Sequence, residues 1–138
     1  MTKAEVSSPT ISLDGLMILC AIDSKEARHV VIIDISGAFL HADMEETVHM
    51  LLEGMMAELI VKLESRMYMK YVWRNKAGKP MLYVQLRKAL YGMLQAALLF
   101  WRLLLDTLIE WGFTLNVYNQ CVTNKTKPSA QWYGMLMT

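Results

Sequence analysis

The chain has 138 residues, of which 54% are hydrophobic and 20% are charged, and its formal net charge is +1. This length allows one domain or a piece of a larger one, and the apolar content excludes an intrinsically disordered chain. The N-terminus lacks a cationic region followed by an apolar core, and the longest uncharged run is too short to cross a bilayer. We therefore expect an intracellular protein with no signal peptide and no membrane partner.

The small net charge conceals an uneven distribution of charge. Residues 1–64 hold eleven acidic and four basic residues, whereas residues 65–138 hold ten basic and two acidic residues. This asymmetry indicates a polyanionic partner for the second half, although the two halves could equally pair with each other.

The first predicted element is a helix near the N-terminus. Ser8 is a candidate N-cap, and Pro9 suits the first helical position. Four apolar residues then share one helical face: Leu13, Leu16, Met17 and Cys20. We expect this helix to pack on a sheet. Cys20 and Cys121 lack metal-binding spacing, so we expect both to be reduced core thiols.

Four consecutive branched apolar residues, Val30 to Ile33, run directly into Asp34. Such a run predicts a strand buried on both faces. A carboxylate at the end of a buried strand is costly unless a partner or a metal compensates it. Asp34 is therefore either a functional carboxylate or an ordinary cap of the turn at Ser36-Gly37.

The next segment carries two histidines and several acids. If it were helical, His41, Glu45 and His49 would stack on one face as a transition-metal site. The alternative is a solvated acidic loop, since the two-histidine spacing of the zincins is not met.

A second amphipathic helix is predicted over 54–68, and a β-hairpin over 68–86 with its turn at 75–80. Seven basic residues and no acid lie on this hairpin and its flanks, interleaved with aromatic residues. Positive charge beside aromatic faces suits nucleic acid, although an ordinary solvated hairpin would look the same. The basic residues are Arg66, Lys70, Arg74, Lys76, Lys79, Arg87 and Lys88.

The last third begins with the strongest predicted helix, Ala96 to Trp111, which should be largely buried and stop at Gly112. A strand over 113–122, a turn over 125–128 and a strand over 131–138 complete the prediction.

Several stretches together resemble the reverse transcriptase of copia-type retrotransposons. They are SSPTISLDGLMILCAID, VVIIDISGAFLHADMEETVHM, VQLRKALYGMLQAALLFW and EWGF, and the resemblance covers about residues 7–125. It implies an α+β fold, a partial palm and fingers sheet backed by helices with a projecting β-hairpin.

The resemblance also implies roles for particular residues. Asp34 matches the first catalytic aspartate, which helps to bind two divalent metal ions, Mg²⁺ or Mn²⁺. The backbone carbonyl of Ile35 belongs to the same site. Phe39 matches the aromatic residue under the incoming sugar, and Gln95 matches the glutamine that contacts the incoming nucleotide.

The implied partners are an RNA or DNA template-primer, deoxynucleoside triphosphates and the remainder of a polyprotein. The Tyr-x-Asp-Asp box of the family is missing, and no acid follows Glu110. We therefore expect a partial polymerase domain that is inactive as an isolated chain, with exposed apolar surface. The alternative is a non-catalytic nucleic-acid-binding remnant that uses the basic Arg66–Lys88 hairpin.

Overall fold

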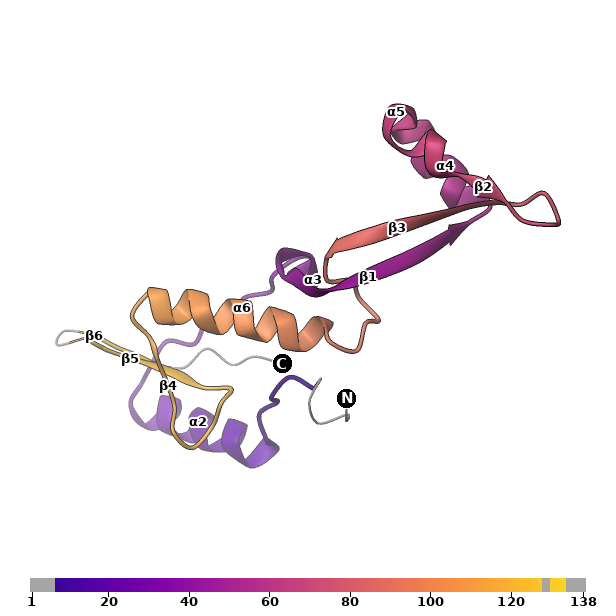
Figure 1. Cartoon of the computed structure of the whole chain (residues 1–138). Coiled ribbons are helices and arrows are strands. Elements are labelled where there is room, and N and C mark those ends of the chain that lie inside the picture. The colour runs from indigo at the N-terminus through magenta and orange to yellow at the C-terminus, as the bar shows by residue number, and fades with distance from the viewer. Residues whose placement is uncertain (1–6, 128–129, 134–138) are drawn as a thin grey trace. The chain divides into compact units, whose positions relative to one another are not determined.

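The computed structural model describes residues 7–127 and 130–133. The described residues form an α+β structure, with helices and two small three-stranded sheets (Figure 1). The chain divides into two compact units. Unit 1 comprises the residues up to Asp43 together with those from Ala89 onward, and unit 2 comprises Met44–Lys88.

The N-terminal helix, α2, spans Leu13–Lys25. It begins after Ser12, whose Oγ accepts a hydrogen bond of 3.1 Å from the backbone N–H of Gly15. The helix is confirmed, but its predicted start at Pro9 is wrong. The predicted packing is also wrong, because no residue of α2 is buried and Met17 is 63% exposed. Helical spacing shows which side chains share a face, not whether another element covers that face.

The segment Val30–Ile33 is neither helix nor strand, and its side chains are exposed. The predicted strand, buried on both faces, is therefore wrong. A buried strand needs a hydrogen-bonding partner. Within each of the two sheets the strands pair only with strands of the same sheet, and none of them pairs with residues 30–33. The turn at Ser36-Gly37 is confirmed, and the short helix α3 (Ala38–His41) follows it.

Helix α6 (Ala96–Glu110) confirms the strongest helix predicted from the sequence. The prediction that it is largely buried is wrong, because only Ala96, Leu99 and Leu108 of its residues are buried and Ile109 is 50% exposed. The helix ends just before Gly112, whose φ of +83° is the left-handed conformation that glycine adopts without strain. The backbone N–H of Gly112 donates to the carbonyl of Ile109 at 2.9 Å, which satisfies one of the last helical carbonyls.

The sheet of unit 1 follows α6 and has the order β4-β5-β6, with antiparallel neighbours. Its strands are β4 (Thr114–Leu115), β5 (Thr123–Lys127) and β6 (Ala130–Tyr133). Strand β5 covers the start of the turn predicted over 125–128, so that prediction is wrong there. Strand β6 confirms the start of the last predicted strand, and residues 134–138 lie outside the described residues.

The strand predicted over 113–122 is reduced to β4 because Asn116 turns the chain. The side-chain oxygen of Asn116 accepts hydrogen bonds from the backbone N–H groups of Tyr118 and Asn119, at 2.8 and 3.2 Å. Cys121 follows this turn and is buried, and burial raises the pKa of its thiol. The core prediction is thus correct for Cys121 and wrong for Cys20, which is exposed on α2.

Unit 2 holds the other sheet, in the order β1-β3-β2, with two helices and a 3₁₀ turn inserted between β1 and β2 (Figure 1). The strands are β1 (Asp43–Glu53), β2 (Trp73–Arg74) and β3 (Pro80–Lys88), and the insertion is α4 (Met55–Leu63), α5 (Ser65–Tyr68) and η1 (Met69–Tyr71).

The core of unit 2 lies between α4 and the sheet. Leu82 and Ala57 are fully buried and Leu52 is 8% exposed. Partly buried side chains pack around them: Met50, Ile60, Tyr68, Val72 and Val84. Burial alternates along the second half of β3, so that Val84 and Leu86 are partly buried while Tyr83, Gln85 and Arg87 are exposed.

Three predictions for unit 2 need correction. Residues 43–53 form a strand, so His41, Glu45 and His49 do not stack on a helix face. The predicted helix over 54–68 breaks at Glu64, which has non-helical φ and ψ of −140° and 71°. The hairpin is confirmed, but its first strand is only β2, because Tyr71 lies in η1.

Candidate functional site

Asp34 lies in the irregular segment before α3, and its side chain is exposed. It makes no hydrogen bond or ion pair with the residues that the structure describes, so it does not cap the turn after it. Within the same residues, no cluster of three His, Cys, Asp or Glu side chains could hold a metal ion. Asp34 can therefore offer a metal one carboxylate and needs further ligands from elsewhere.

The Ile35 carbonyl, which the resemblance assigns to the metal site, accepts a hydrogen bond of 3.1 Å from the Ala38 N–H. A carbonyl oxygen has two lone pairs, so one stays available for a second partner. The turn holds this oxygen in a fixed orientation immediately after Asp34.

Phe39 lies on α3, which packs against α6. Its ring centroid is 4.5 Å from that of Tyr91 and 6.2 Å from that of Phe100, and both ring pairs are tilted. The backbone N–H of Ala89 donates to the carbonyl of Ala42 at 3.0 Å, which ties the two segments together. The structure therefore fixes α3 against the segment that leads into α6.

Gln95 immediately precedes α6 and is its N-cap. Its backbone carbonyl accepts the first helical hydrogen bond, from the N–H of Leu99 at 2.9 Å. The structure thus brings the segments of Phe39 and Gln95 together in unit 1. No described hydrogen bond or ion pair joins Asp34 to either residue.

The seven basic residues predicted for nucleic acid all belong to unit 2, but several already interact within the chain. Lys79 Nζ lies 2.6 Å from a carboxylate oxygen of Glu53, and Arg74 Nη1 donates to the Gly78 carbonyl at 2.7 Å. Lys70 lies over the ring of its neighbour Tyr71, and Lys88 is also engaged. All seven are exposed, and three of them make no interaction among the described residues: Arg66, Lys76 and Arg87.

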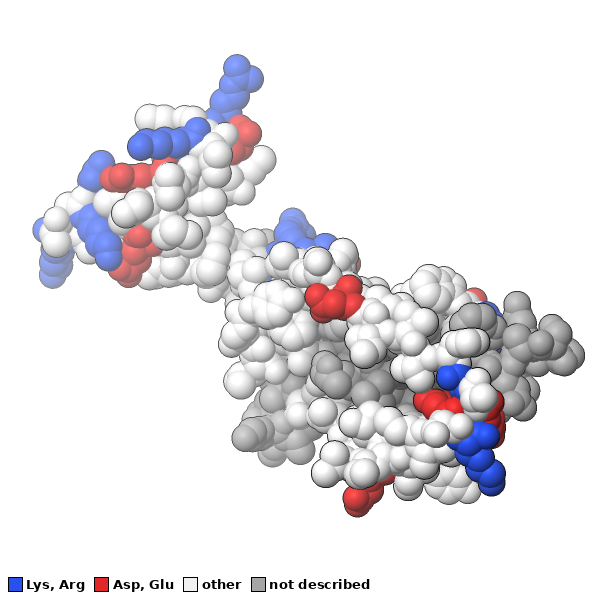
Figure 2. Space-filling view, turned by 180° about the vertical axis from the view of Figure 1, so that it is seen from behind, with Lys and Arg blue, Asp and Glu red and all other residues white. Residues whose placement is uncertain are grey.

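Unit 2 contains eight basic and five acidic residues, a net charge of +3. Figure 2 shows basic side chains around the end of unit 2 that carries α4 and α5, with acidic side chains between them. The positive field is therefore moderate and uneven, in contrast to the acid-free run of residues 66–88 in the sequence.

Trp73 on β2 and Tyr83 on β3 form an exposed aromatic pair. Their rings are stacked, with centroids 6.4 Å apart and an interplanar angle of 15°. Trp73 lies opposite Met81 in the register, so Trp73 and Tyr83 share the face of the sheet that Arg87 also occupies. The exposed fractions of 45% and 55% leave much of both side chains accessible.

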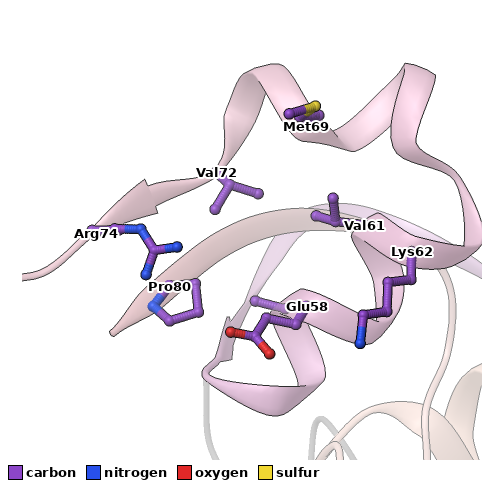
Figure 3. A pocket seen from close by; sticks show the side chains of 8 residues that line it. Glu58, Val61, Lys62, Met69, Val72, Arg74 and Pro80 are labelled. Carbon is purple, nitrogen blue, oxygen red and sulfur yellow. The ribbon is translucent and has the colours of Figure 1, made fainter. Parts of the chain in front are cut away.

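A pocket of about 360 Å³ lies in unit 2 between α4 and the β2–β3 hairpin (Figure 3). Its apolar wall includes Val61, Val72 and Pro80, and its charged groups are Glu58, Lys62 and Arg74. In Figure 3 the guanidinium of Arg74 points toward Pro80. The charged part of the lining is therefore mixed, with two cations and one carboxylate beside an apolar wall.

Sequence reasoning missed two groups of residues. Tyr91 and Phe100 were not connected with Phe39, and Lys62 was not connected with Arg74. No spacing rule could have found either group, because the partners lie on separate elements that only the folded chain brings together. The aromatic residues among the basic ones were visible in the sequence, but not the stacking of Trp73 on Tyr83.

Among the residues that the structure describes, no helix is both long and apolar enough to span a membrane. Comparisons with protein-family models, with curated proteins and with solved structures give no match for this chain.

Proposed function

We propose that the chain is part of a copia-type RNA-directed DNA polymerase domain, in which Asp34 is one of the carboxylates that hold the catalytic metal ions. The ordered motifs in the sequence support this proposal. The structural observation that carries it is the packing of α3 against α6, which puts Phe39 beside the segment leading to Gln95. These are the two segments to which the resemblance assigns nucleotide contacts.

Within this proposal the residues present have limited roles. Bound Mg²⁺ or Mn²⁺ would polarise the triphosphate and activate the primer hydroxyl. Asp34 and the Ile35 carbonyl would contribute two oxygen ligands, and the fixed ring of Phe39 would support the sugar. Two metal ions need more carboxylates than Asp34, so the Tyr-x-Asp-Asp segment must complete the site, and we propose that the isolated chain does not synthesise DNA.

The test of this identity is to read the genomic DNA on both sides of the reading frame, in all three frames. A Tyr-x-Asp-Asp box a short distance downstream is the expected result, and it would assign the chain to a cut or frame-shifted polymerase gene. If no such box exists in any frame, the polymerase proposal fails, and only a binding function remains.

A second candidate function is nucleic-acid binding by unit 2, and the exposed stack of Trp73 on Tyr83 specifically favours it. Single-stranded nucleic acid binds where bases can stack on aromatic rings and cations can neutralise the phosphates. Arg87 shares the face of the aromatic pair, and Lys76 lies in the neighbouring turn.

We expect Trp73→Ala to weaken the binding of a fluorescein-labelled single-stranded RNA by about tenfold, since stacking on an aromatic residue contributes about 1–3 kcal/mol per base. Fluorescence anisotropy of the full chain measures this. The matched control is Tyr118→Ala, which removes an aromatic residue that is 97% exposed but lies in unit 1. Asp34→Ala should leave the affinity unchanged. An affinity that does not fall as the salt concentration rises would contradict this function.

A further inference from the structure

Strand β3 presents a row of exposed side chains along one face of its sheet: Tyr83, Gln85 and Arg87. They alternate with Val84 and Leu86, which are partly buried on the opposite face. Strand β3 lies between β1 and β2 in the sheet (Figure 1). Alternate residues of a strand are about 6.6 Å apart, so the β3 row of Tyr83, Gln85 and Arg87 is extended and evenly spaced.

Each member of the β3 row matches a different part of a nucleotide. Tyr83 stacks with Trp73 and leaves aromatic surface exposed. Gln85 is exposed and its side chain makes no hydrogen bond among the described residues, so its amide donor and its carbonyl acceptor are both available. Arg87 is exposed in the same way, and its guanidinium is a free cation within the described part of the chain. The row therefore offers a stacking surface, an amide and a cation, in that order.

We infer that a single-stranded nucleic acid lies along β3, with one base stacked on the Trp73–Tyr83 pair, the edge of the next base hydrogen-bonded to Gln85, and a phosphate bound by Arg87. This path rests on the nucleic-acid binding proposed above for unit 2, to which it adds the course of the strand and a base-contacting residue. A single strand drawn out of its helical stack extends beyond the rise of about 3.4 Å per nucleotide in a duplex, so successive nucleotides can match the spacing of the row.

Gln85 makes the site selective for unpaired bases. The Watson–Crick edge of each base carries a hydrogen-bond donor next to an acceptor, and a side-chain amide is complementary to that arrangement. In a duplex these edges are already paired and the faces of the bases are covered by their neighbours. A duplex can therefore bring only its phosphates to the cations of this region, Lys76 in the turn before β3 and Arg87.

Fluorescence anisotropy of the full chain tests the role of Gln85 with three labelled probes: a short oligothymidylate, the same strand annealed to oligoadenylate, and an abasic strand of the same length. We expect Gln85→Ala to weaken the binding of oligothymidylate about fivefold, because it removes hydrogen bonds to a base. The affinities for the duplex and for the abasic strand should not change. Gln120→Ala is the matched control, since it removes an exposed amide from unit 1 and should leave all three affinities unchanged.

Arg87→Ala separates the phosphate contact from the base contact. It should weaken oligothymidylate and the abasic strand by the same factor and reduce the slope of log affinity against log salt concentration by about one. Lys25→Ala is the control, since it removes one exposed positive charge from unit 1 and should leave the slope unchanged.

The outcomes distinguish this path from the binding function on which it rests. If Trp73→Ala weakens oligothymidylate but Gln85→Ala does not, nucleic-acid binding by unit 2 stands and the path along β3 is wrong. Equal losses for oligothymidylate and the abasic strand in Gln85→Ala would also overturn the base contact. If the wild-type chain binds none of the three probes, the path and the binding function both fail.

Discussion

Asp34→Asn is expected to reduce primer extension by about a thousandfold in a polymerase domain completed with a Tyr-x-Asp-Asp segment. Asparagine keeps the size of the side chain but removes the negative charge that binds the metal ions. Metal ions contribute several kcal/mol of transition-state stabilisation, and each 1.36 kcal/mol corresponds to a factor of ten in rate. The measurement is the rate of nucleotide incorporation on a template-primer, with Mg²⁺ and separately with Mn²⁺.

The structure allows an effect of Asp34→Asn on catalysis to be separated from an effect on stability. Asp34 is exposed and has no hydrogen bond or ion pair among the described residues, so the substitution should not change the melting temperature. Asp14→Asn makes the same chemical change at an exposed position in the first turn of α2 and should leave the rate nearly unchanged. Wild-type synthesis by the Asp34→Asn domain would contradict the assigned role.

Leu82→Ala is expected to destabilise unit 2 by about 2–5 kcal/mol, because it leaves a cavity between α4 and the sheet. Leu82 is fully buried on β3, and Leu52 and Ala57 complete the cluster around it. A unit of this size has a small core and limited stability, so a loss of this magnitude should unfold it. Hydrogen exchange measures the effect as lost protection of the β1 and β3 amides.

The control for this substitution is Leu63→Ala at the end of α4. Leu63 is 80% exposed, so its truncation should change stability by less than about 0.5 kcal/mol. Unchanged protection of β1 and β3 in the Leu82→Ala variant would show that this cluster is not the core of unit 2.

The sequence predicted an element correctly where the interactions that form the element join residues close together in the chain. The long apolar pattern from Ala96 onward predicted α6, and Gly112 predicted its end, because helical hydrogen bonds join residues four apart and glycine adopts the left-handed conformation. The turn chemistry of residues 75–80 predicted the β2–β3 hairpin for the same reason.

The prediction for Val30–Ile33 failed because a strand is not a local structure. Its apolar, β-branched composition fits a buried strand, but forming one requires a second strand at the right distance and direction. The described chain pairs β1 with β3 and β4 with β5 instead. The predicted stacking of His41, Glu45 and His49 on a helix face failed for a related reason. This segment pairs with β3 and forms a strand, in which side chains four residues apart do not stack as they do on a helix.

The sequence by itself determined the α+β class, the positions of α6 and the β2–β3 hairpin, the basic character of residues 66–88 and the candidate motifs at Asp34, Phe39 and Gln95. The tertiary structure alone decided that Phe39 packs on Tyr91 and Phe100, that Trp73 stacks on Tyr83, and that Lys79 is paired with Glu53. These contacts join residues that lie on different elements of the fold. Their formation depends on how whole elements pack, which no local pattern of residues specifies.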